Sequence, residues 1–125
     1  MRAELNLVLA IALFTTPLIA DASTAEVRVR YTPVQYLKNF AFSVCIGEGF
    51  KSEGDVAKEA RAAAGGYLEL GSFPIEAAEQ ADALAKKYLA KEYLGIHGDK
   101  LTLMKCIDLF HSKELDRLAR KYSRK

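Results

Sequence analysis

The chain has 125 residues, of which 50% are hydrophobic and 27% are charged, and its formal net charge is +2. This length suits one domain, and this composition is typical of a globular protein and excludes a disordered or low-complexity chain. Two cysteines alone cannot build a structural zinc site or an iron–sulfur cluster, and two histidines disfavour a His-rich metal centre. No phosphate-binding or hydrolase motif is present either. We therefore expect no catalytic residues, no metal and no cofactor.

Residues 1–22 have the pattern of a secretory signal peptide. A nearly continuous apolar run over residues 5–20 is followed by Ala20-Asp21-Ala22, which offers the small-x-small pattern for cleavage. A membrane anchor is disfavoured because the run is shorter than the ~20 residues that span a bilayer, and because Pro17 lies inside it. We predict export, cleavage and no membrane association afterwards. The net charge of the chain that remains after residues 1–22 are removed is too small to indicate nucleic-acid binding.

An extended arm is predicted over residues 23–32, and a helix is predicted to follow it. Thr32-Pro33-Val34-Gln35 combines a capping box with proline at the first helical position. Phe42 and Ile46 fall outside the main apolar face of this helix, so its apolar arc is wide. Such a helix is either central in the bundle or shared with a partner. The main face comprises Leu37, Phe40, Ala41, Val44 and Cys45.

Two further helices are predicted on either side of residues 71–74. The first opens at Ser52 and Asp55, ends at Leu70 and has Gly71 in the C′ position. Its inner face is Val56, Ala60, Ala63, Ala64, Tyr67 and Leu68, and Gly65-Gly66 indicates a close approach of another helix. The next helix starts at Ser72-Phe73-Pro74 and turns Ile75, Ala78, Ala81, Ala85, Tyr88 and Leu89 inward.

A loop and two more helices complete the predicted fold. Residues 94–100 lack periodicity and contain two glycines. A helix with Leu103, Cys106, Ile107 and Phe110 on its inner stripe follows, and Ser112 caps a last helix with Leu115, Leu118, Ala119 and Tyr122 inward. The short connections favour antiparallel neighbours. We predict an all-α fold, a compact bundle of about five helices over residues 33–125.

Cys45 and Cys106 lie on predicted inner faces, and in an exported chain two cysteines most simply form a disulfide. The alternative is a catalytic thiolate that works with His97 or His111. It is disfavoured because a nucleophile needs an exposed, electropositive site. A structural hydrogen-bonding role is favoured for His111, whereas His97 lies in the glycine-flanked loop. From its residues alone, the chain is a small exported helical binding protein.

Three stretches in order resemble the immunity proteins of type VI secretion amidases, the partners of the fourth family of peptidoglycan amidase effectors. The C-terminal signature is Met104-Lys105-Cys106-Ile107-Asp108-Leu109-Phe110-His111-Ser112-Lys113-Glu114-Leu115. The two others are Phe42-Ser43-Val44-Cys45-Ile46 and Gly66-Tyr67-Leu68-Glu69-Leu70-Gly71, the latter followed by Pro74-Ile75-Glu76-Ala77. The resemblance covers residues 36–122.

The resemblance implies a periplasmic, all-helical inhibitor that forms a homodimer and is not an enzyme. Its partner would be a papain-like Cys–His amidase that cuts the D-glutamyl–diaminopimelate bond, inhibited by a loop that enters the active-site cleft. We expect that loop to be the glycine-containing segment Leu94, Gly95, Ile96, His97, Gly98, Asp99 and Lys100. The alternative is an exported helical protein that binds a small ligand or acts like a chaperone.

Overall fold

The computed structural model describes residues 29–95 and 97–124, and five helices account for most of them. These are α1 (Pro33–Gly49), α2 (Gly54–Gly71), α3 (Ile75–Leu89), α4 (Thr102–Phe110) and α5 (Lys113–Ser123). No strand occurs in this part of the chain, so the predicted all-α bundle of five helices is confirmed. The signal peptide predicted for residues 1–22 and most of the predicted arm lie outside the described residues.

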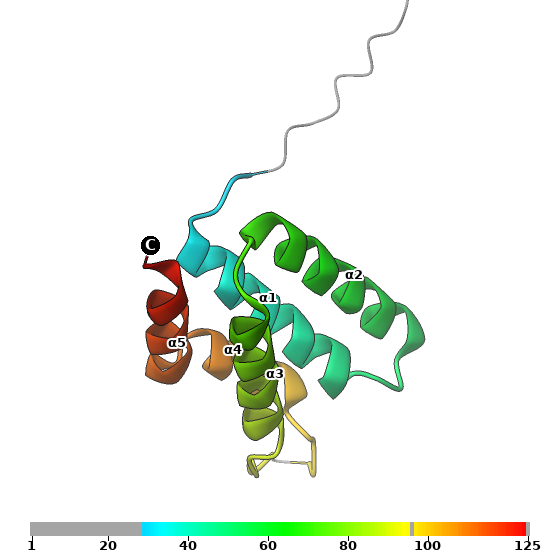
Figure 1. Ribbon diagram of the computed structural model, residues 1–125. Coiled ribbons are helices and arrows are strands. Elements are labelled where there is room, and N and C mark those ends of the chain that lie inside the picture. The colour runs from blue at the N-terminus through cyan, green and yellow to red at the C-terminus, as the bar shows by residue number, and fades with distance from the viewer. Residues whose placement is uncertain (1–28, 96, 125) are drawn as a thin grey trace, which may run out of the picture.

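Helix α1 is the centre of the bundle, and it packs against each of the other four helices (Figure 1). Its start is the predicted capping box. The Thr32 hydroxyl accepts a hydrogen bond from the Gln35 backbone N–H at 3.2 Å, and the Gln35 side-chain oxygen accepts one from the Thr32 N–H at 2.9 Å. Leu37, Ala41 and Cys45 are fully buried along one side of the helix. The wide apolar arc therefore reflects, at least in part, a central position within the chain.

Helix α2 lies beside α1 and packs mainly on it, which corrects its predicted inner face. The buried stripe is Ala57, Ala60 and Ala64, whereas Val56 and Leu68 are exposed and Ala63 faces solvent. A helix with one main neighbour buries only a narrow stripe, and alanines let the two helices lie close together. The predicted close approach at Gly65-Gly66 is wrong: a Cβ at either position would meet no atom within 4 Å.

The turn from α2 to α3 differs from the prediction by one residue. Gly71 is the last helical residue, and Ser72 takes the left-handed conformation with φ of 49°. Gly71 is needed for packing, because a Cβ there would lie 2.5 Å from the Phe73 ring and 3.0 Å from Tyr36 Cβ. Helix α3 then begins at Ile75, which is exposed rather than inward, while Ala77, Ala78, Ala81 and Ala85 are buried.

A disulfide joins Cys45 of α1 to Cys106 of α4, as the sequence predicts. Both residues are fully buried, and their Cα atoms lie 5.6 Å apart. In α4 the buried residues are Cys106 and Leu109, whereas Leu103 and Ile107 are exposed, so the predicted stripe on this helix is half wrong. The disulfide sets which side of this short helix faces the core. The Ser112 cap of α5 is confirmed by a hydrogen bond from the Leu115 N–H at 3.1 Å.

Candidate interaction surface

The segment between α3 and α4 projects from one end of the bundle (Figure 1). It includes the residues predicted to bind the effector, from Leu94 to Lys100. Leu94 is 99% exposed, and the side chains of His97, Asp99 and Lys100 are exposed as well. The predicted site residue Ile96 lies outside the described residues. An exposed leucine of this kind contributes nothing to the core and is available to a partner.

Two glycines shape the tip of this loop. A Cβ at Gly95 would lie 2.8 Å from the Asp99 carbonyl oxygen and 3.0 Å from the Asp99 nitrogen, so the backbone closes on itself there. Gly98 has φ of +73°, a conformation that L side chains rarely adopt. The N–H of Gly98 also donates a hydrogen bond to the Gly95 carbonyl at 3.4 Å. Gly95 and Gly98 are therefore held close together, and neither carries a side chain.

The two ends of the loop meet on Gly49, the last residue of α1. A Cβ at position 49 would collide with the methyl group of Thr102, at the start of α4, and would lie 2.9 Å from Leu89 Cδ2, at the end of α3. The absent side chain lets both ends of the loop close over the end of the central helix. Position 49 is thus a place where the fold requires glycine.

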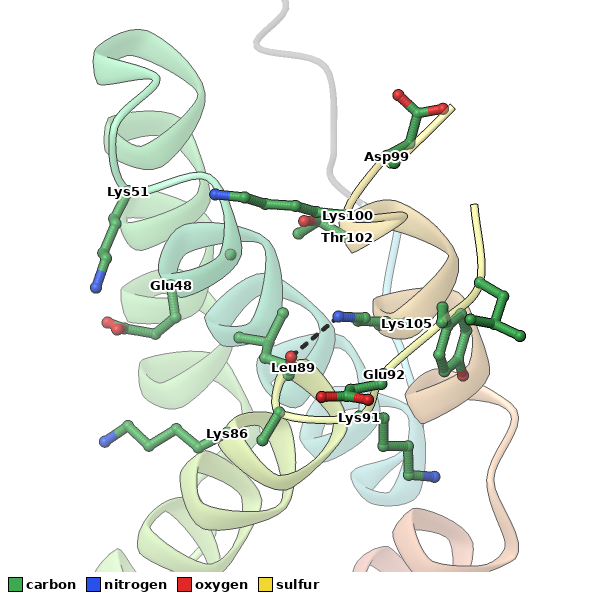
Figure 2. Close-up of a pocket in the computed structure, with 15 residues that line it drawn as sticks. Glu48, Lys51, Lys86, Leu89, Lys91, Glu92, Asp99, Lys100, Thr102 and Lys105 are labelled. Carbon is green, nitrogen blue, oxygen red and sulfur yellow. Dashed lines mark hydrogen bonds between the residues drawn. The ribbon is translucent and has the colours of Figure 1, made fainter. Parts of the chain in front are cut away.

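Two polar contacts tie α4 to the end of α3 and to the start of the loop. The Lys105 ammonium donates a hydrogen bond of 3.2 Å to the Leu89 carbonyl, one of the carbonyls left free at the C-terminus of α3 (Figure 2). The Tyr93 hydroxyl donates to the Asp108 carboxylate. That hydrogen bond raises the pKa of Tyr93, because it stabilises the protonated phenol. Sequence reasoning missed both contacts.

A hollow of about 700 Å³ lies between the loop and the end of α1. It is lined by side chains from the α1–α2 turn, α3, the loop and α4, as Figure 2 shows. Five of them are lysines: Lys51, Lys86, Lys91, Lys100 and Lys105. The carboxylates that share this hollow are Glu48, Glu92 and Asp99. The loop therefore projects from an end of the bundle where cations outnumber anions.

The remaining candidate residues assemble no reactive site. Cys45 and Cys106 are consumed by the disulfide, so neither is a thiolate nucleophile. His111 is exposed, and its ring meets the edge of Phe110 at 5.3 Å between centroids. No cluster of three or more His, Cys, Asp or Glu side chains suited to a metal occurs in the described part of the chain. Within those same ranges, no helix combines the length and the apolar character needed to cross a membrane.

Comparison with protein families identifies the family of the domain that carries this surface. Residues 35–119 match the model of the type VI secretion system (T6SS) amidase immunity proteins, the Tai4 family. The chain belongs to this family. Members of the Tai4 family are inhibitors that partner a cognate effector amidase, so the chain is an immunity protein rather than an enzyme. The match extends from α1 through the loop and into α5, which makes the loop part of the family domain.

Solved structures agree with the family assignment. The structure of the effector–immunity system Tae4/Tai4 from Salmonella typhimurium matches with a TM-score of 0.68 and 37% sequence identity, over 73% of this chain and 89% of that one. A structure described under new type VI-secreted toxins and self-resistance proteins in Serratia marcescens matches with a TM-score of 0.66 and 25% identity, over 77% and 85% of the two chains. A comparison with curated proteins gives no match.

Proposed function

We propose that this Tai4-family chain protects the periplasm of its host by inserting the loop Leu94–Lys100 into the active-site cleft of a secreted amidase. The amidase would be a papain-like Cys–His enzyme that cuts the D-glutamyl–diaminopimelate bond of peptidoglycan. A cleft that admits an extended peptide excludes a helix more readily than a narrow loop. The observation that carries the proposal is a loop with an exposed tip and both ends fixed to the bundle.

Fixed ends matter because a loop that is ordered before binding loses less conformational entropy on entering a cleft. Gly49, Lys105 and Tyr93 hold the loop ends to α1 and α4. The loop ends therefore lose their conformational entropy when the protein folds and not when it binds. At the tip, Gly95 and Gly98 allow the backbone to approach the cleft walls closely. We assign Ile96 to an apolar subsite, and His97 and Asp99 to hydrogen bonds near the catalytic pair.

Periplasmic location is proposed from the N-terminal sequence and from the disulfide. Residues 1–22 carry the pattern of a cleaved signal, and disulfides persist in oxidising compartments such as the periplasm. N-terminal sequencing of the periplasmic protein should find a chain that begins at Ser23, or at Glu26 if cleavage follows the second small-x-small pattern, Ser23-Thr24-Ala25. An intact Met1 in the periplasm or the inner membrane contradicts export with cleavage.

We further propose that the protein is a homodimer that uses the apolar side of α1 near Phe42. Phe42 is half-buried, with its ring edge against Phe110 at 5.8 Å between centroids. It lines two shallow hollows, one of about 570 Å³ toward α2 and one of about 290 Å³ toward α4. Ile46 and the exposed residues Val56 and Ile107 continue this apolar surface. An apolar patch of this kind suits a two-fold interface, in which two copies present the same surface to each other.

The inhibitory loop is tested by replacing residues 96–99 with a Ser/Gly linker. The variant should no longer inhibit the cognate amidase in a peptidoglycan-hydrolysis assay, because the residues that fill the cleft are gone. Loop residues contribute little to the core, so its circular dichroism and melting temperature should match those of the parent chain. As a control, Lys58, Ala62 and Glu69 on the exposed side of α2 are replaced by serine, and inhibition should persist. Full inhibition by the linker variant contradicts the proposal.

A further inference from the structure

Four of the five lysines that line the hollow beside the loop have no carboxylate within 4.0 Å among the described residues. They are Lys51, Lys91, Lys100 and Lys105; Lys86 pairs with Asp82 at 2.6 Å. On the α5 side of the bundle, by contrast, Lys38 and Lys87 are both paired, with Asp116 and Glu114, at 2.7 Å each. Lysines without an ion-pair partner are thus gathered at the end of the bundle that carries the loop.

Lys105 is half-buried, as is Lys91, whose ammonium lies 3.5 Å from the centre of the Tyr88 ring; Lys51 and Lys100 are exposed. The Lys105 ammonium makes one hydrogen bond, to the Leu89 carbonyl, and lies 5.7 Å from the centre of the Tyr93 ring. An ammonium group has three N–H donors, so two of them remain for solvent or for a partner. When a partner covers the hollow, those donors lose water, and the loss is costly unless an anion replaces it.

The acidic side chains of the hollow do not neutralise its excess of lysines. Glu48 acts together with Asp82 on Lys86: the hydrogen bond to Asp82 raises the pKa of Lys86 most, and the charge of Glu48 adds to it. Asp99 is exposed, and in Figure 2 its carboxylate points away from Lys105 and out of the hollow. Glu92 is exposed on the segment that leads into the loop. None of the three carboxylates forms an ion pair with a lysine of the hollow.

We propose that this lysine hollow, defined by Lys51, Lys91, Lys100 and Lys105, receives an acidic segment of the amidase at the rim of its active-site cleft. The inference rests on the proposed function, because a loop that enters the cleft brings the surface around its base against the rim. Complementary charge speeds association and selects among partners. An amidase with a neutral or basic rim would bury the Lys105 ammonium unpaired, so the hollow also discriminates against such amidases.

The test is the association rate of the chain with its cognate amidase, measured by stopped-flow fluorescence for Lys51→Glu and Lys100→Glu. Both side chains are exposed, so the reversals leave the core intact, and circular dichroism verifies the helical content. We expect each reversal to slow association by about tenfold at ionic strengths near 0.01 M, where the Debye length is about 30 Å. Near 1 M, where it is about 3 Å, the variant and parent rates should converge.

Lys58→Glu is the matched control, since it makes the same change of net charge on the exposed face of α2, outside the hollow. Its association rate should stay within about threefold of the parent rate at low salt. If Lys58→Glu slows association as much as the other two reversals, net charge explains the effect and the proposal is overturned. It is equally overturned if Lys51→Glu and Lys100→Glu associate at the parent rate at low salt.

The amidase assay with the linker variant separates this proposal from the proposed function. Lys51→Glu, which lies outside the loop, should still inhibit fully at saturating concentration, while the linker variant should bind without inhibiting. If the linker variant inhibits and the two reversals slow association, the loop assignment fails and the acidic contact stands. If the linker variant fails to inhibit and the reversals associate at the parent rate, the acidic contact alone is wrong.

Discussion

Gly49 and Thr102 are packed so closely that a methyl group on Gly49 would collide with the Thr102 methyl. The two residues are 53 positions apart in sequence, one at the end of the central helix and the other where α4 begins after the loop. Leu89, at the end of α3, approaches the same point from the other side. One missing side chain thus fixes where the candidate inhibitory loop leaves and rejoins the bundle.

Gly49→Ala should therefore misplace the loop and strain the fold. Forcing an extra methyl into a well-packed site typically costs about 1–3 kcal/mol, and we expect a loss of that size in the free energy of unfolding. Inhibition of the amidase should weaken at the same time, because the loop ends move apart. Urea unfolding and the inhibition constant, measured on the same preparation, test both effects.

Two further variants distinguish this steric effect from a general cost of alanine. In Gly49→Ala/Thr102→Ser, the colliding methyl of Thr102 is removed, so stability and inhibition should both recover in part. Gly65→Ala has open space around it, and alanine is the better helix former by about 1 kcal/mol, so this variant should be as stable as the parent chain or more so. Equal inhibition by Gly49→Ala and the parent chain would show that position 49 does not place the loop.

The Cys45–Cys106 disulfide should be a large part of the stability of this small domain. It closes a loop across 61 residues, and the chain-entropy relation gives about 4 kcal/mol for such a loop. The Cys45→Ala/Cys106→Ala double variant should unfold at a lower urea concentration by a corresponding amount, yet inhibit wherever it remains folded. Free-thiol titration of the denatured, unreduced parent chain should find no thiol; two reactive thiols would refute the pairing.

Acid should weaken the contact between α1 and α5. The hydrogen bond from Lys38 holds the pKa of Asp116 below its ordinary value of 3.8, so the ionised form favours the folded state. This stabilisation is complete above about pH 5 and is lost as the pH falls through the ordinary and then the lowered pKa. Because the carboxylate is 42% exposed and screened by solvent, we expect at most about 1 kcal/mol.

Asp116→Asn should accordingly have a lower free energy of unfolding than the parent chain at pH 7. Near pH 3 the difference between the two free energies of unfolding should be smaller. Urea unfolding at both pH values measures this. Glu69→Gln, on the exposed side of α2, removes an equal charge. The difference in free energy of unfolding between this variant and the parent chain should be the same at both pH values. A constant gap between Asp116→Asn and the parent chain at the two pH values would exclude the Lys38 contact as its cause.

Local signals in the sequence predicted the helices well because each signal acts within a few residues. The Thr32–Gln35 capping box, the Ser112 cap and the number of helices are all confirmed. The inner faces were harder to predict, because a periodic pattern does not reveal how many neighbours a helix has. Val56 and Ile107 share the apolar character of core residues, but within residues 29–95 and 97–124 no other helix buries them, and they are 47% and 42% exposed.

The position of the candidate loop in the sequence was predictable, but the contacts that hold the loop in the fold were not. Two glycines and the absence of periodicity marked the loop, yet Gly49, Leu89 and Thr102 carry no signal that they meet. The Tyr93–Asp108 and Lys105–Leu89 contacts also join segments that only the fold brings together. Gly65-Gly66 shows the opposite error, since small residues predicted a close contact where the structure leaves open space.

The proposed dimer places Ile107 at its interface. Ile107 is 42% exposed and lines the same hollow as Phe42 and Phe110, so a charge there would be buried in the dimer but solvated in the monomer. Ile107→Asp should raise the dimer dissociation constant at least tenfold, equivalent to about 1.4 kcal/mol, and leave a folded monomer. Sedimentation equilibrium gives the constant, and circular dichroism verifies the fold.

Phe42→Asp and Ile46→Asp should act in the same direction, although both residues also pack on the core and their variants should lose some stability. Ile75→Asp is the control, because Ile75 is 62% exposed on α3 and outside this apolar surface. It should dimerise like the parent chain. If Ile107→Asp remains a dimer at the same dissociation constant, or if the parent chain sediments as a monomer at micromolar concentration, the α1 surface is not the interface between two copies of this chain.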